Sequence, residues 1–96
     1  MTRFTIRIKL QQSSPEAYEL LCTYMALHGF TRTITNSSTL ETFQLPPGEF
    51  SFETEEDATK KQILDLAKAA ASAITEEYSV LVTESNGRTW YGLRPV

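Results

Sequence analysis

The residues from Arg3 to Leu10 alternate strictly between polar and apolar side chains, and this alternation restricts what the chain can fold into. The apolar positions are Phe4, Ile6, Ile8 and Leu10, and the cations that alternate with them are Arg3, Arg7 and Lys9. Successive side chains of a strand point to opposite faces of a sheet. The segment from Thr2 to Leu10 therefore predicts a strand in a sheet whose one face covers the core, while its open face carries a basic row.

Length and composition indicate one small domain over residues 1–96. The chain is 41% apolar, which is enough for a single core, and its formal net charge is −3. This negative charge excludes a generic polybasic nucleic-acid binder. No apolar run is long enough to cross a bilayer and no signal-peptide pattern opens the chain, so we expect a cytoplasmic protein with no membrane partner.

Two helices follow from their capping residues. The first is predicted to have Ser14 as its N-cap, Pro15 as its first residue and Gly29 as its left-handed C-terminal cap. The second is predicted to begin near Thr54, whose hydroxyl would cap it while Asp57 reaches back.

Alternating segments around these helices predict the strands. They are Phe30–Thr35, continued by Leu40–Leu45 after a kink or bulge at Asn36-Ser37-Ser38, then Phe50–Phe52 and Tyr78–Thr83. Asn86-Gly87 follows as the strongest hairpin signal, with a further strand from Arg88 to Leu93. The order predicts an α+β, ferredoxin-like βαββαβ fold: a four-stranded antiparallel sheet, both helices on one face, and an extra C-terminal strand.

The predicted core is formed by the apolar faces of the strands and helices. Its expected members are Phe4, Ile6, Ile8, Leu21, Phe50, Phe52, Leu66, Ile74, Val80 and Val82. The extra strand must pair at a sheet edge, and an open edge invites association. We therefore predict a homodimer built through the terminal hairpin, with Trp90 and Tyr91 in its interface.

The basic row has two interpretations. In a ferredoxin-like sheet the first and third strands are neighbours, so Glu49 and Glu53 would face the row of Arg3, Arg7 and Lys9 and neutralise it. Alternatively, the row is free and forms the floor of a groove for RNA phosphates. The RNA-binding candidates are then Arg3, Arg7, Lys9, Arg88 and Arg94.

The usual signatures of catalytic and metal sites are missing. His28 is the single histidine and Cys22 the single cysteine, so one chain assembles neither a zinc cluster nor a Cys/His dyad. His28 fits the last helical turn and Cys22 fits the core. We expect no metal and no cofactor, and we assign no catalytic residue.

Three local features occur together over nearly the full chain. They are the first strand followed by the Ser13-Ser14 helix start, Phe30 after the first helix, and the Gln44-Leu45 turn leading into Ser51-Phe52. In these features the chain resembles the GhoS-type endoribonuclease antitoxins, whose ferredoxin-like fold is related to that of small CRISPR nucleases. The resemblance implies a cytoplasmic protein that acts on a toxin transcript by cleaving RNA, without an obvious metal site.

Two departures limit what the resemblance implies. The segment from Leu10 to Ser13 contains no acid where the related nucleases place an aspartate, and Pro15–His28 contains no arginine or lysine. Two function classes therefore remain open. One is an RNA-binding protein of the antitoxin type, with arginines that could assist RNA cleavage. The other is a non-catalytic homodimeric interaction module on the same fold.

Overall fold

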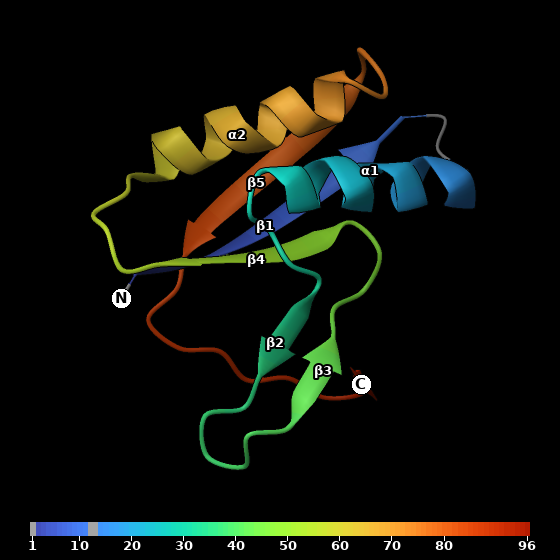
Figure 1. Cartoon of the computed structure of the whole chain (residues 1–96). Coiled ribbons are helices and arrows are strands. Elements are labelled where there is room, and N and C mark those ends of the chain that lie inside the picture. Colours follow the sequence, from blue (N-terminus) through green and yellow to red (C-terminus); the bar gives the residue numbers. More distant parts are fainter. Residues whose placement is uncertain (1, 12–13) are drawn as a thin grey trace.

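The structure is a computed structural model that describes residues 2–11 and 14–96. Its larger part is a three-stranded antiparallel sheet with two helices on one face (Figure 1). The strands of this large sheet, in spatial order, are β4 (Glu49–Thr54), β1 (Thr2–Leu10) and β5 (Tyr78–Glu84), and the helices are α1 (Pro15–Leu27) and α2 (Lys60–Ser72). The face away from the helices is the open face of the basic row.

A second, small sheet lies on the open-face side and corrects the predicted fold (Figure 1). Its strands are β2 (Thr33–Thr35), β3 (Thr42–Gln44) and β6 (Arg94–Pro95), with β3 in the middle. The chain is therefore α+β with two separate three-stranded antiparallel sheets. The prediction of one four-stranded ferredoxin-like sheet was wrong.

The first reason for this correction is the turn at Asn36. The predicted kinked strand is a hairpin, in which β2 pairs with β3 and Ile34 lies opposite Phe43. The Asn36 Oδ1 atom accepts hydrogen bonds from the backbone N–H groups of Ser38 and Thr39, at 2.8 and 3.2 Å. An asparagine that binds the backbone ahead of it in this way closes a turn.

The second reason is the C-terminal segment. Residues 85–93 do not return along β5; they pass across to the small sheet, where Arg94 of β6 pairs with Gln44 of β3. Gly87 lacks the positive φ that a type I′ hairpin turn requires. The predicted terminal hairpin was therefore wrong, and the extra strand pairs within its own chain.

The boundaries of α1 are confirmed. Ser14 Oγ accepts a hydrogen bond from the backbone N–H of Ala17 at 3.2 Å, Pro15 is the first helical residue, and Gly29 has φ +90°. Ser13, which belongs to the predicted helix start, lies outside the described residues.

The predicted start of α2 was wrong. Thr54 is the last residue of β4, paired with Thr2, so the helix begins at Lys60 instead. Thr59 is the N-cap, and the side chain of Gln62 completes the capping box. No helix in residues 2–11 and 14–96 is long and apolar enough to cross a membrane.

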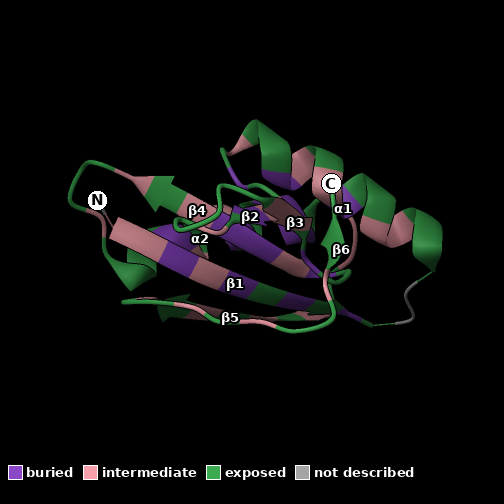
Figure 2. Ribbon diagram, turned by 90° about the horizontal axis from the view of Figure 1, so that it is seen from below, coloured by how far each residue is buried: buried purple, intermediate pink, exposed green. Residues whose placement is uncertain are grey.

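The core lies between the large sheet and the helices, and it confirms the predicted strand faces. Five of the ten predicted members are buried and the other five are partly buried against them: Phe4, Ile6, Ile8, Leu21 and Phe50, then Phe52, Leu66, Ile74, Val80 and Val82. Figure 2 shows the alternation of burial along β1. The opposite phase of β1 places the three predicted cations on the open face.

Candidate anion-binding surface

Arg3 of β1 and Arg88 of the C-terminal segment both contact residues of the large sheet. Arg3 Nε lies 3.0 Å from Glu53 Oε1, and Arg88 Nη2 lies 3.6 Å from the same oxygen. Arg88 Nη1 also donates to Ser51 Oγ at 3.1 Å and to Thr5 Oγ1 at 3.5 Å. These contacts attach the C-terminal segment to the open face.

Arg88 is the most enclosed of the five predicted RNA-binding cations, with a side chain 14% exposed. Burial lowers the pKa of Arg88, the nearby charge of Arg3 lowers it further, and Glu53 raises it. A guanidinium nevertheless stays protonated in proteins. One carboxylate therefore serves two cations, and this cluster keeps one positive charge in excess.

Arg7 and Lys9 occupy the other half of the open face, where both are exposed. The register places Arg7 opposite Glu49 on β4 and opposite Leu81 on β5, and it confirms the prediction that Glu49 faces the basic row. Among the residues that the structure describes, neither cation forms an ion pair with Glu49 or any other carboxylate. The basic row thus has two parts. Arg3 is paired with Glu53, whereas Arg7 and Lys9 have no carboxylate partner in the described structure and form the free part.

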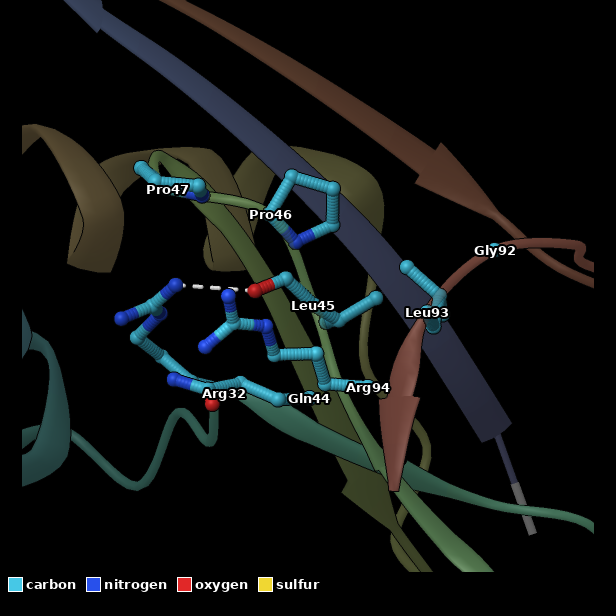
Figure 3. Close-up of a pocket in the computed structure, with 8 residues that line it drawn as sticks. All are labelled: Arg32, Gln44, Leu45, Pro46, Pro47, Gly92, Leu93 and Arg94. Carbon is cyan, nitrogen blue, oxygen red and sulfur yellow. Dashed lines mark hydrogen bonds between the residues drawn. The ribbon is translucent and has the colours of Figure 1, made fainter. Parts of the chain in front are cut away.

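A pocket of about 430 Å³ opens beside the small sheet, with Arg32 and Arg94 among its lining residues (Figure 3). The strands on either side of β3 bring the two arginines together. Arg94 of β6 pairs with Gln44, and the carbonyl of Arg32, just before β2, accepts from the N–H of Leu45 at 2.7 Å. The other walls are Pro46, Pro47, Gly92 and Leu93, and none of the described lining residues is acidic.

Arg32 is held at one side of its guanidinium group. Its Nη2 donates to the carbonyl of Leu45 at 2.8 Å, whereas its buried Nε has no hydrogen-bond partner in the described structure. Figure 3 shows the side chain of Arg94 extending toward the same carbonyl. Within residues 2–11 and 14–96, neither arginine forms an ion pair. Two guanidinium groups in one pocket repel each other, and a bound anion would satisfy both.

The pocket adjoins the free part of the basic row. Gly48 accepts a hydrogen bond through its carbonyl from the N–H of Ile8 at 2.8 Å, and Ile8 lies between Arg7 and Lys9. Pro46 and Pro47, the two residues before Gly48, form one wall of the pocket. The two pairs of cations, Arg7 with Lys9 and Arg32 with Arg94, therefore flank the turn at residues 46–48, and Glu49 follows directly after it. We call this group, Arg7, Lys9, Arg32 and Arg94, the cationic end.

The fold separates the two predicted interface aromatics. Trp90 packs against Phe43 of β3, with ring centroids 5.6 Å apart in an edge-on arrangement. Tyr91 is fully exposed. Trp90 therefore anchors the C-terminal segment to the small sheet of its own chain.

Arg32 is absent from the predicted candidates because its role depends on the small sheet. Its one local signal is a single cation among the threonines 31, 33 and 35. That pattern does not connect it with Arg94, because the two arginines meet through β3. Among the described residues, no group of three His, Cys, Asp or Glu side chains is placed to hold a metal ion.

Comparison with protein-family models and with curated proteins finds no match to this chain. The resemblance to the GhoS-type antitoxins therefore stays a prediction, and function has to be inferred from the geometry of the cationic end.

Proposed function

We propose that the protein binds single-stranded RNA through phosphate contacts of the cationic end. The observation that supports this proposal is the division of the cations. Arg3 and Arg88 have a carboxylate partner, whereas the four members of the cationic end have none among the described residues. Contacts from Lys and Arg to phosphates supply most of the sequence-independent affinity for nucleic acids. The choice of RNA rests on the resemblance to the antitoxin family.

The shape and charge of the molecule favour a single strand over a duplex. Arg88 and the small sheet cover the part of the open face around Ser51, which is 2% exposed. The free cations therefore form a short track, and the chain as a whole has a net charge of −3. A flexible strand can follow such a track, whereas a rigid duplex would bring further phosphates against acidic surface.

The proposal concerns binding. The cationic end contains arginines and a lysine but no histidine or cysteine, and Glu49 lies at its border. Arginines can stabilise the charge of a phosphoryl transition state, but general acid–base chemistry needs a group that titrates near the working pH. Cleavage of a toxin transcript in the cytoplasm stays a prediction of the family resemblance.

Removing the two exposed cations of β1 should weaken RNA binding and its dependence on salt. We expect the Arg7→Ala/Lys9→Ala variant to reduce the slope of log K against log salt by roughly 1.4, because each single-strand phosphate contact contributes roughly 0.7. The measurement is a titration of a 3′-labelled, 5′-hydroxyl single-stranded RNA of mixed sequence at several salt concentrations.

A matched control removes the same charge from the opposite side of the molecule. Lys60 and Lys68 are exposed on α2, which covers the other face of the large sheet. Lys60→Ala/Lys68→Ala should leave the salt slope at the parent value. The proposal fails if the parent shows no salt-dependent affinity, or if both double variants lose affinity equally.

A second candidate function, a homodimeric interaction module, is favoured by β5. In the described structure β5 pairs with β1 alone, so its other edge is open, and Leu81 beside that edge is 62% exposed. Open strand edges invite pairing with another chain. If this candidate holds, sedimentation at micromolar concentration should show a dimer for the parent and a monomer for Leu81→Lys. A monomeric parent would exclude it.

A further inference from the structure

We infer that the Arg32–Arg94 pocket receives a terminal phosphate of the bound strand, that is, a phosphomonoester at its end. This inference rests on the proposed RNA binding and goes beyond it, because it assigns separate tasks to the two parts of the cationic end. Arg7 and Lys9 on the sheet would contact backbone phosphates, and the two arginines of the pocket would bind the end of the strand.

The charge of the pocket is the first argument. Two guanidinium groups lie in it, and no acidic residue is among its described lining residues. A backbone phosphodiester carries one negative charge, whereas a phosphomonoester carries about 1.5 to 2 at pH 7. The terminal group therefore matches the charge of the two arginines, and its additional oxygens can accept hydrogen bonds from both guanidinium groups at once.

The second argument is which N–H donors of Arg32 and Arg94 already have hydrogen-bond partners. The Nη2 of Arg32 is fixed by the carbonyl of Leu45 at 2.8 Å, so the guanidinium is oriented before any ligand arrives. Its Nε is buried without a partner in the described structure. Because this Nε is enclosed, a ligand in the pocket would contact Arg32 through its Nη atoms. Arg94 lies across from it and forms no ion pair among the described residues, so its donors are available to a ligand.

The shape of the pocket is the third argument. Its volume of about 430 Å³ is in the range of small-ligand sites, and it is large enough for one phosphate with the adjoining sugar or base. Leu45, Pro46 and Leu93 supply apolar walls beside the arginines. Such walls suit the carbon faces of a nucleotide better than they suit a free inorganic ion, which offers no apolar surface.

The test compares three RNAs of one sequence that carry a 5′-phosphate, a 3′-phosphate or hydroxyls at both ends. Each competes, unlabelled, against the same labelled reference strand. We expect one phosphorylated RNA to bind the parent at least about tenfold more tightly than the hydroxyl RNA, as charged hydrogen bonds of this kind imply. Arg94→Gln should remove this preference, whereas Arg7→Ala/Lys9→Ala should weaken all three RNAs by one common factor and keep the preference.

Arg94 is the residue to change first because its side chain is exposed, whereas that of Arg32 also binds the carbonyl of Leu45. Thermal denaturation of Arg94→Gln should match the parent. Arg94→Lys should restore part of the preference, since lysine keeps the charge without the bidentate fork.

Three results would overturn the inference: equal affinity for phosphorylated and hydroxyl RNAs, a preference that survives Arg94→Gln, or inorganic phosphate alone competing as strongly as the phosphorylated strand. If the parent binds all three RNAs equally and with salt dependence, the terminal-phosphate site is excluded and RNA binding stands. If it binds none of them, both proposals fail.

Discussion

Replacing Ile6 by alanine should lower the free energy of unfolding by about 2–5 kcal/mol, the range for large-to-small changes in a core. Ile6 is fully buried in the central strand of the large sheet, between Phe50 on β4 and Val82 on β5. The removed atoms lose their transfer free energy, and the rigid neighbours on both sides cannot close the cavity. Chemical denaturation of the parent and the variant measures the effect.

The control for this prediction is an aliphatic side chain of similar size outside the core. Leu27, the last residue of α1, is 76% exposed. Leu27→Ala should stay within about 0.5 kcal/mol of the parent, as is usual for surface changes. If Ile6→Ala behaved like Leu27→Ala, the assignment of the apolar face of β1 to the core would be wrong.

Gly48→Ala should have a comparably large effect, roughly 2–5 kcal/mol of lost stability, from two causes that add. Gly48 has φ +84°, a region in which an L side chain is strained. A Cβ atom there would also lie 2.5 Å from the carbonyl oxygen of Ile8, which belongs to the central strand and cannot move away freely. Alanine would therefore push the turn at Pro46-Pro47 away from β1.

Two other glycines separate these causes. Gly92 has φ +81° and open space around its Cβ position, so Gly92→Ala should show the backbone strain alone, about 1–2 kcal/mol. Gly87 has open space and no positive φ, and Gly87→Ala should be within about 0.5 kcal/mol of the parent. Chemical denaturation of the three variants should rank the losses Gly48, Gly92, Gly87. An equal loss for Gly48→Ala and Gly92→Ala would show that the contact with Ile8 contributes nothing.

Features that depend on neighbouring residues could be predicted from the sequence. The alternation along β1 determines which side chains face the core, and it places Phe4 and Ile6 there with no exposed surface. The limits of α1 follow from Ser14 and Gly29 because capping is a contact within one turn of helix. The order of the strands also predicted that Glu49 and Glu53 face the basic row, and the pairing of β1 with β4 confirms it.

Features that depend on competition between distant segments could not be predicted. Thr54 and Thr59 are both plausible N-caps, but pairing with Thr2 retains Thr54 in β4 and leaves the helix to start later. Asn86-Gly87 is a strong local hairpin signal. It is overruled by two contacts: Arg88 with Ser51 holds the chain on the open face of the large sheet, and Trp90 packs on Phe43 of the small sheet.

In the candidate site, too, some features could be predicted from the sequence and others could not. Arg7 and Lys9 were predicted on the open face from the period of β1 alone, and they lie there exposed. Arg32 and Arg94 share a pocket because β3 lies between the strands that carry or follow them. A pattern in the sequence shows the charge of each arginine but not that the two lie together.

The position of β1 between β4 and β5 has a consequence for the synthesis of the protein. β1 leaves the ribosome before its two partner strands, which are residues 49–54 and 78–84. At common rates of translation, roughly 4–15 s pass between the synthesis of residue 10 and that of residue 84. During this time the apolar face of β1 lacks its full cover, and a nascent chain in this state is a substrate for chaperones. Arg94 is made later still, so the pocket of Arg32 and Arg94 can form only after all three strands of the large sheet have been made.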